Sequence, residues 1–303
     1  MLNHKQCDAF LAVIETGSFD AAALRLSITA SAVTLRVQSL EKSLGHILIV
    51  RERPCYTTDA GSRLLNYLQH SRLREQDFLQ HLSGQSEDFY TINIATNADS
   101  LATWLLPTIQ PCLIQHKIMA HFQVDDQTQT HLLMQTGLVN ACISAEPRAM
   151  MGCSAEPLGH MNYRLVASAE FIDTWFAQGL TRGALSNAPA ILYNPKDQLH
   201  SNLMLKQFGL TPACYPHHFI PSSSAFAEAI FNGLGFGLVP DYQIGTRLKT
   251  GQLVDLSPEF KVEVALYWHH WKQQALPLDQ LTQHLIQQAS KNMNSVAKAL
   301  THQ

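Results

Sequence analysis

The apolar residues of this chain change their periodicity once, and this change limits the folds that it can adopt. Up to about residue 82 they recur at intervals of three and four residues, which is typical of amphipathic helices. After a polar stretch at about 83–88, "SGQSED", strand-like runs such as "YTINIAT" alternate with helical segments over roughly 200 residues. The alternation predicts an α/β region with a mostly parallel sheet, folded as two similar lobes.

The first 60 residues are expected to hold three short helices and a hairpin. Thr29 or Ser31 is a suitable N-cap for the third helix, predicted over 30–43, and Gly45 is a suitable residue to end it. Four apolar residues on one face of that helix are expected to bury it against the first two: Val33, Val37, Leu40 and Leu44. The strand signal "ILIV", a turn at Pro54 and a returning "CYT" predict a small β-wing. Three helices followed by a wing form a winged helix-turn-helix.

The face of the third helix opposite its apolar stripe carries side chains that suit contact with DNA. Short polar groups near a helix N-terminus can approach base edges and phosphates, and two guanidinium groups flank the wing. The candidate DNA-binding residues are Ser31, Thr34, Leu35, Arg36, Gln38, Lys42, Arg51 and Arg53. A plain three-helix bundle with a solvated polar face fits the same pattern. The charge is a weak guide, because residues 1–82 hold 9 Lys/Arg and 8 Asp/Glu (net +1) and the rest hold 12 and 16 (net −4), which sum to −3.

A long helix is predicted over 60–82, after the capping residues Thr57, Thr58 and Asp59. Its apolar residues gather at its two ends and include Leu64, Leu65, Leu68, Leu73, Phe78, Leu79 and Leu82. They fit a seam between two subunits, although the polar middle "QHSRLREQD" does not continue a coiled coil.

Two strand-to-helix junctions in the α/β region suit the binding of a small ligand. "NADSLATWLLP" follows one strand and "PSSSAFAEAI" follows another, and each offers free backbone N–H groups and hydroxyls at a helix start. Two such helix starts facing each other across a cleft would form a ligand site at the strand ends. Ordinary N-caps are the alternative for each serine.

Several other classes of function lack support in the sequence. "GLGFG" follows a helix and precedes a strand, the reverse of the dinucleotide-binding order. The paired histidines of "YPHHF" and "YWHH" are expected to point to opposite faces of strands, so no metal site is predicted. The six cysteines form no CxxC pair and are read as reduced thiols. With no nucleophile elbow, phosphate loop, secretion signal or membrane-spanning run, we expect a cytoplasmic, non-enzymatic protein without a cofactor or a membrane partner.

The stretch "FDAAALRLSITASAVTLRVQSLEKSLGHILIVRERPCYTTDAG" resembles the N-terminal signature of the LysR-type transcriptional regulators. The matching positions are dense and collinear: Ala22, Ala23, Leu26, Ser31, Ala32, Val33, Leu40, Glu41, Gly45, Leu48, Arg51, Thr58 and Gly61. The resemblance implies binding to double-stranded DNA, a dimer formed through the long helix with a tetramer left open, and contact with RNA polymerase. Leu35 stands where the family often has Gln or Arg, and it can touch a thymine methyl but cannot form a bidentate contact with guanine.

The rest of the chain resembles the branch of this family that senses lysine and arginine, with "NADSLATWLLP" as the most specific piece. The resemblance implies a two-lobed effector domain like a periplasmic binding protein, and control of an amino-acid exporter gene. A basic amino acid needs a seat for its carboxylate, for which Ser100 is the candidate, and anions for its cations. The candidate anions follow predicted strands: Asp99, Asp125, Asp126, Glu146 and Asp197, the last for the side-chain end. Thr128 and Ser223 are candidate polar lining residues.

The expected organisation is a winged helix-turn-helix at 1–59, a linker and dimerisation helix with hinge at 60–89, and the effector domain at 90–303. Lobe I is expected at about 90–163 and 266–303 and lobe II at about 164–265, with crossover strands near residues 163 and 265. Ligand binding is expected to close the lobes and to change the spacing of the winged helices on DNA. The rival hypothesis is a DNA-binding inhibitor of chromosome replication initiation without amino-acid control, as one member of this branch is described.

Overall fold

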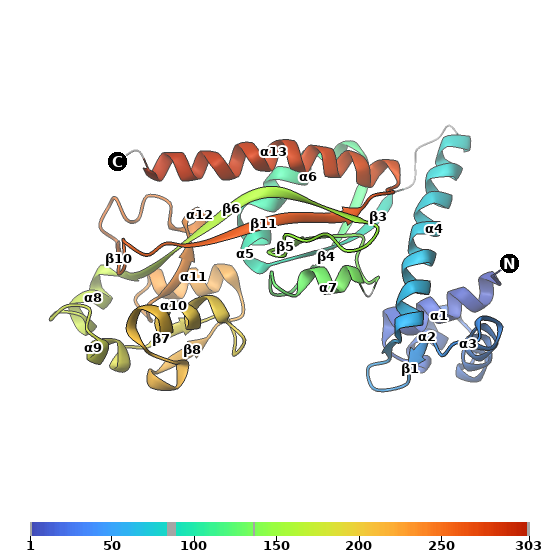
Figure 1. Cartoon of the computed structure of the whole chain (residues 1–303), viewed down its shortest axis with the longest axis horizontal. Coiled ribbons are helices and arrows are strands. Elements are labelled where there is room, and N and C mark those ends of the chain that lie inside the picture. The colour runs from blue at the N-terminus through green and yellow to red at the C-terminus, as the bar shows by residue number, and fades with distance from the viewer. Residues whose placement is uncertain (1, 84–88, 136, 302–303) are drawn as a thin grey trace.

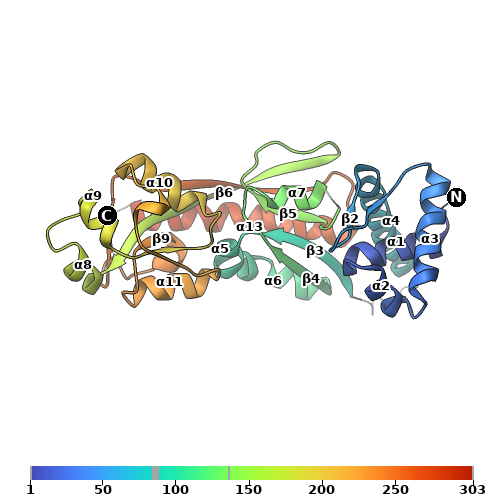
Figure 2. The same cartoon turned by 90° about the horizontal axis from the view of Figure 1, so that it is seen from below.

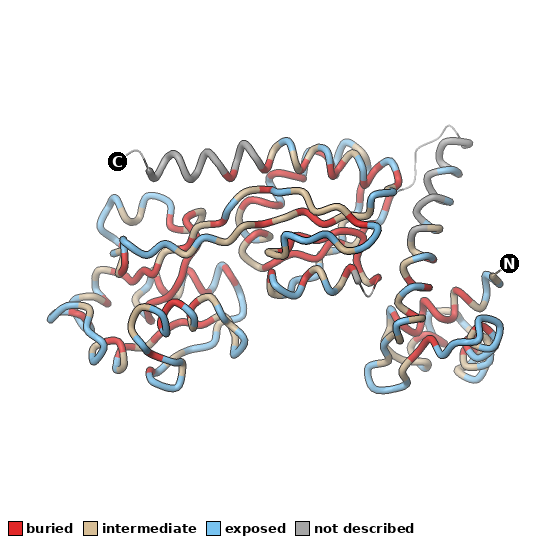
Figure 3. The backbone as a smooth tube through the Cα atoms, viewed as in Figure 1, coloured by how far each residue is buried: buried red, intermediate tan, exposed pale blue. Residues whose placement is uncertain are grey.

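The computed structural model describes residues 2–83, 89–135 and 137–301. A helical head lies at one end of the molecule, a long twisted sheet occupies the middle, and a second α/β lobe lies at the other end (Figure 1). Buried residues form one region inside the head and another along the strands of the α/β part (Figure 3). Among the described residues, no helix combines the length and the apolar character needed to cross a bilayer.

The head consists of α1 (His4–Thr16), α2 (Phe19–Leu26), α3 (Ala30–Leu44) and a wing of β1 (Ile49–Val50) paired with β2 (Tyr56–Thr57). Each helix begins at a side chain that accepts a hydrogen bond from a free backbone N–H. For α3 this residue is Thr29, which accepts from the nitrogen of Ala32 at 3.2 Å. Gly17 and Gly45 end α1 and α3. The predicted third helix and wing are therefore present.

The apolar stripe of α3 is buried as predicted, except at its last residue. Val33, Val37 and Leu40 have no exposed surface and pack with α1 and α2. The prediction was wrong for Leu44, which is 37% exposed. Leu44 is the last residue of α3, where the chain turns away at Gly45, so its side chain stays partly in solvent.

The helix α4 (Asp59–Ser83) begins inside the head. Its first apolar residues, Leu64, Leu65 and Leu68, are buried in the head's own core, so this end of the helix is not the free subunit seam that its pattern predicted. Phe78 is exposed further along. The side chains of Leu73, Leu79 and Leu82 lie outside the described residues, as does the predicted linker from residue 84 to 88.

The α/β part is built on one seven-stranded sheet with the order β10-β6-β11-β5-β3-β4, and β9 pairs with the outer part of β6. The strands are β3 (Tyr90–Thr96), β4 (Ile118–Val124), β5 (Ala141–Ser144), β6 (Cys153–Ser168), β9 (Gly237–Pro240), β10 (Leu253–Asp255) and β11 (Val262–Trp271). A separate parallel pair joins β7 (Ala190–Leu192) to β8 (His217–Phe219) in the second lobe.

Among the described residues, the predicted parallel pairing holds within the first lobe, between β7 and β8, and at one isolated bridge between Ala190 and Phe236. In the first lobe, β3 is parallel to both β4 and β5, because helices connect these strands. The long strands β6 and β11 are antiparallel to each other and to their other neighbours. They cross between the lobes side by side, with Tyr163 opposite Val262, and these are the two predicted crossover strands.

Helices cover the sheet of the first lobe and form much of the second lobe. Figure 2 shows α8 to α11 of the second lobe at the end of the molecule opposite the head. The remaining helices are α5 (Ala98–Ser100), a π-helix (Leu101–Leu105), α6 (Leu106–Gln115), α7 (Thr130–Gln135), α8 (Ala169–Trp175), α9 (Arg182–Asn187), α10 (Gln198–Phe208), a 3-10 helix (Pro212–Cys214), α11 (Ser223–Phe231), α12 (Asp241–Ile244) and α13 (Leu276–Thr301). The last, α13, packs along β6 and α6 and so completes the first lobe, as predicted.

Candidate functional site

The polar face of α3 lies on the surface of the head. Ser31, Gln38 and Lys42 are exposed, and Leu35 is 64% exposed although it is apolar. Arg36 and Thr34 are half-buried, and the Thr34 hydroxyl donates to the carbonyl oxygen of Ala30 in its own helix at 2.9 Å. The helix therefore presents a polar surface with one large apolar side chain, a shape that suits a groove lined by base edges and thymine methyls.

The two wing arginines have different surroundings. The Arg51 guanidinium lies 5.1 Å above the centre of the Phe19 ring and 3.9 Å from a Glu41 carboxylate oxygen. Glu41 also accepts a hydrogen bond from the backbone nitrogen of Leu48 at 2.9 Å, which ties the wing to α3. Arg51 thus helps to hold the wing in place, whereas Arg53 is exposed in the turn between β1 and β2.

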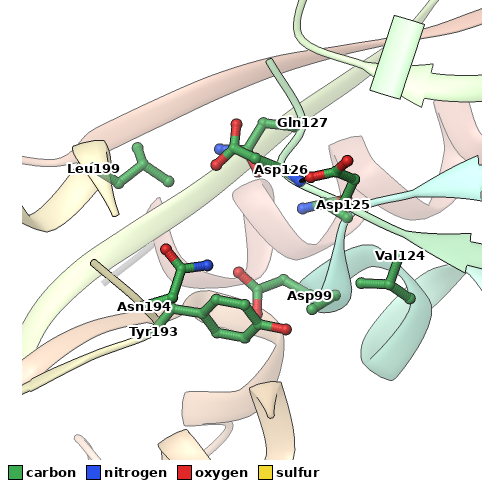
Figure 4. Close-up of a pocket in the computed structure, with 10 residues that line it drawn as sticks. Asp99, Val124, Asp125, Asp126, Gln127, Tyr193, Asn194 and Leu199 are labelled. Carbon is green, nitrogen blue, oxygen red and sulfur yellow. Dashed lines mark hydrogen bonds between the residues drawn. The ribbon is translucent and has the colours of Figure 1, made fainter. Parts of the chain in front are cut away.

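An acidic cavity of about 170 Å³ opens between the two lobes (Figure 4). It is lined by Asn97, Ala98, Asp99, Val124, Asp125, Asp126, Gln127, Tyr193, Asn194 and Leu199. Its first-lobe wall comes from the end of β4 and the segments that follow β3 and β4, and its second-lobe wall from the segment after β7 and the first turn of α10. This is the position at the carboxyl ends of parallel strands where open α/β folds bind ligands.

Asp99 is the centre of a hydrogen-bond network that joins the lobes. Its carboxylate accepts from the Ser223 hydroxyl at 2.6 Å and from the Tyr163 hydroxyl at 2.9 Å. The Gln243 amide in turn donates to the Ser223 oxygen at 3.0 Å. Ser223 begins α11 of the second lobe, and Tyr163 lies on the crossover strand β6, so one carboxylate connects α5 to both.

Burial raises the pKa of the Asp99 carboxyl, although the hydrogen bonds from Ser223 and Tyr163 act in the opposite direction. Burial also raises the pKa of Asp197, whose carboxylate accepts from the backbone nitrogens of Tyr193 at 3.1 Å and His200 at 3.2 Å. Asp197 caps α10 behind the cavity wall and does not line the cavity. Burial therefore disfavours the ionised form of both carboxyls, and a cation beside Asp99 would offset this cost.

The lining of the cavity, taken over the described residues, contains three carboxylates, Asp99, Asp125 and Asp126, and no Lys, Arg or His. Asn97 also lines the cavity, and its buried Oδ1 atom has no hydrogen-bond partner in the part of the chain that the structure describes. Figure 4 shows the Asp99 carboxylate between the Tyr193 ring and the Asp125–Asp126 turn. Such a cavity stabilises a ligand that carries positive charge and hydrogen-bond donors.

Five predicted effector residues do not line this cavity: Ser100, Thr128, Glu146, Asp197 and Ser223. Ser100 is fully buried, and its hydroxyl accepts from the Trp104 indole at 3.2 Å instead of facing a ligand. The Glu146 carboxylate accepts from the backbone nitrogen of Arg148 at 3.0 Å. Thr128 is exposed and donates to the Asp126 carboxylate at 2.6 Å, so it supports a lining residue from outside. The remaining predictions, Asp99, Asp125 and Asp126, line the cavity, and Ser223 bonds to Asp99.

Sequence reasoning did not select Asn97, Gln127, Tyr193 and Asn194, which complete the polar part of the lining. Asn97 directly follows a predicted strand, so the rule that selected the aspartates would also have found it. Tyr193 and Asn194 follow β7, and only the structure shows that this strand ends at Leu192. Tyr163 gave no such signal, because it lies within a long strand and reaches Asp99 only when that strand crosses between the lobes.

We expect the affinity for a cationic ligand to rise as the pH rises from 3.8 through the raised pKa values of Asp99 and Asp197. A carboxyl whose folded pKa is raised adds stability below its ordinary value of 3.8, and this stability is lost as the pH rises through the folded value. Ionised Asp99 and Asp197 then destabilise the free protein, and a bound cation offsets this. Thermal unfolding with and without ligand across this range measures the effect. A ligand-induced shift in Tm that is constant or falls with pH would contradict it.

No group of three or more His, Cys, Asp or Glu side chains in the described part of the chain is arranged to hold a metal ion. The paired histidines form local contacts instead: His217 lies 3.1 Å from the carbonyl oxygen of Tyr215, and His269 is buried against that of Glu146.

Comparison with known proteins agrees with both halves of this architecture. Residues 4–62 match the family described as "Bacterial regulatory helix-turn-helix protein, lysR family", and residues 85–290 match "LysR substrate binding domain". The HTH-type transcriptional regulator ArgP of Photobacterium profundum is 37% identical over 289 residues, which cover 95% of this chain and 97% of the relative.

Two of the solved structures that match nearly the whole chain belong to similar regulators. The crystal structure of ArgP from Mycobacterium tuberculosis has 35% identity and a TM-score of 0.81, with 96% of this chain and 98% of that chain covered. The full-length LysR-type regulator LysG from Corynebacterium glutamicum with bound effector Arg has 30% identity and a TM-score of 0.76, with 96% and 99% covered. These relatives are named as regulators, in agreement with the prediction of a non-enzymatic protein.

Proposed function

Because this chain belongs to the LysR family of transcriptional regulators, we propose that it is a DNA-binding regulator whose activity responds to a basic amino acid, arginine or lysine, bound in the acidic cavity. The observation that carries the proposal is a lining whose described residues include three carboxylates and no cationic side chain. Arginine bound to the similar regulator LysG supports the same ligand class.

The cavity offers separate partners for the two cationic groups of such a ligand. Asp99, with the buried Oδ1 atom of Asn97, suits the α-ammonium group, and Asp125 and Asp126 suit the side-chain cation. Tyr193 and Asn194 supply second-lobe contacts, so a ligand that touches both walls stabilises the closed arrangement of the lobes. Asp197 supports that wall from behind by holding the backbone of Tyr193.

The head supplies the DNA contacts in this proposal. Ser31, Leu35 and Gln38 are assigned to base edges, and Arg36, Lys42 and Arg53 to phosphates. Arg51, which lies over Phe19, is assigned mainly to holding the wing. The functional units are the head at 1–59, the linker helix and hinge at 60–89 and the effector domain at 90–303. Subunits pair through the exposed part of α4, so that two modest half-site contacts add in one complex.

In the cell, we place the protein in the cytoplasm, at the promoter of an amino-acid exporter gene, where it contacts RNA polymerase. Ligand binding closes the lobes, and closure changes the spacing of the heads on DNA. The alternative, a replication-initiation inhibitor without amino-acid control, predicts the same DNA footprint with and without arginine. The acidic cavity favours the regulated form.

Thermal unfolding of the full chain with arginine, lysine, citrulline and glutamate tests the ligand class. Citrulline is the matched control, because it has nearly the shape of arginine without the side-chain charge. At a ligand concentration of about 100 times Kd, arginine or lysine is expected to add about 2.7 kcal/mol and to raise Tm by several degrees. A shift with citrulline as large as with arginine, or no shift with either basic amino acid, would contradict the proposal.

A further inference from the structure

A turn of the first lobe lies against the head of the same chain. Leu138, which follows α7, is half-buried and packs against the apolar cluster of the head that contains Leu64, Leu65 and Leu68. In Figure 1 the last turn of α7 lies on the side of the first lobe that faces α4. The chain itself joins the head to the first lobe between α4 and β3. Leu138 lies more than 40 residues beyond that connection, so its contact is a second place at which the two domains meet.

The neighbouring glycine allows the backbone to approach α4 closely. Gly137 has a φ of 76°, a left-handed conformation that favours glycine. A Cβ atom at this position would lie 2.5 Å from the Asn66 Oδ1 atom and 3.1 Å from the Asn66 backbone nitrogen. A larger residue at 137 would therefore both strain the turn and push it away from α4.

The turn is rigidly joined to the sheet of the first lobe. The backbone nitrogens of Gly137 and Leu138 donate to the carbonyl oxygens of Met134 and Leu133, each at 3.0 Å, which is the bonding pattern of a Schellman motif. Met134 is fully buried in a cluster with Cys142 of β5. The turn therefore moves with the sheet.

The same short helix begins at the acidic cavity. The backbone nitrogen of Thr130 donates to the carbonyl oxygen of the lining residue Asp126 at 3.0 Å. The Thr130 hydroxyl donates to the carbonyl oxygen of Ile143 at 2.6 Å. The six residues of α7 span about 9 Å between the lining turn and the contact with the head. One rigid element thus borders both the ligand cavity and α4.

We infer that the Gly137–Leu138 turn is an intramolecular docking contact through which the first lobe sets the position of the DNA-binding head. Its partner is the surface of α4 around Asn66. Any ligand that moves the first lobe relative to α4 changes this contact, and by linkage a loosened contact changes the response to the ligand. The transmission of the ligand signal rests on the proposed function, whereas the docking contact does not.

Hydrogen exchange of the full-length protein, read over residues 60–70, tests the contact in Gly137→Ala. Gly251→Ala is the matched control, because Gly251 has a φ of 72° but no described atom lies within 4 Å of the place that its Cβ would take. We expect Gly137→Ala to raise the exchange rate of this segment at least about threefold and Gly251→Ala to leave it unchanged. Leu138→Ser removes the apolar contact without backbone strain and is expected to raise exchange as Gly137→Ala does. Adding Asn66→Ala to Gly137→Ala removes the side chain that the new Cβ atom would meet, and is expected to restore part of the protection.

The same experiment with arginine tests the transmission. In the wild type, arginine is expected to change exchange over 60–70, and in Gly137→Ala this change is lost while the arginine-induced rise in Tm remains. Equal exchange in Gly137→Ala and Gly251→Ala would overturn the docking contact. A head response that persists in Gly137→Ala would overturn the transmission. If arginine does not raise the Tm of the wild type, the proposed function and the transmission both fail, and the docking contact is judged from exchange without ligand alone.

Discussion

Replacing Asp99 with asparagine is expected to weaken arginine binding by about 100-fold, because it removes the carboxylate that would face the ligand's cation in a buried site. The neutral amide keeps the size of the side chain and an acceptor for Ser223. Without ligand, the variant is expected to be at least as stable as the wild type, because burial disfavours the ionised form of Asp99. Calorimetric titration with arginine measures the loss, and thermal unfolding shows that the fold is intact.

Glu146→Gln is the matched control for this change. It removes one carboxylate that also follows a strand, but that carboxylate bonds to the backbone of Arg148 and does not line the cavity. We expect arginine affinity within about twofold of the wild type, since surface changes away from a site have small effects. Equal losses in the two variants would show that net charge, and not the position of Asp99, controls binding.

Introducing glutamate at Ser31 is expected to reduce DNA binding by at least about 100-fold. Ser31 is exposed in the first turn of α3, where a carboxylate would repel the phosphates that the helix must approach. The head should stay folded, because a negative charge near a helix N-terminus is favourable for the helix itself. Gel shifts with genomic fragments enriched by the wild-type protein measure the loss.

Ser186→Glu makes the same change of residue and net charge in α9 of the second lobe. We expect it to bind the same fragments with nearly wild-type affinity, since its charge lies far along the chain from the head. If Ser31→Glu retained wild-type binding at low salt, the polar face of α3 would not be the surface that contacts DNA.

The sequence alone predicted the three helices and the wing of the head, and most of the alternating strands and helices that follow; it did not predict α8, α9, α12 or β10. The signals there are local: Thr29 accepts from the backbone three residues on, Gly45 ends the same helix, and Val33, Val37 and Leu40 recur at helical spacing. The strands β3 and β4 have the bounds of the apolar runs that predicted them, Tyr90–Thr96 and Ile118–Val124. Contacts between residues three or four positions apart follow from the periodicity of the helix, so they can be predicted from a single sequence.

Only the tertiary structure decided which side chains meet. Asp99 and Ser223 are 124 residues apart and bond at 2.6 Å, while Ser100, next to Asp99, points into the core toward Trp104. The pattern that predicts a helix start after a strand does not say which of two adjacent residues faces the cleft, because that depends on how the helix packs on the sheet. Likewise Leu64 and Leu65 fit a subunit seam by pattern, yet the head's own core covers them. Apolar periodicity shows that a face is buried, and the partner that buries it is determined by packing between distant segments.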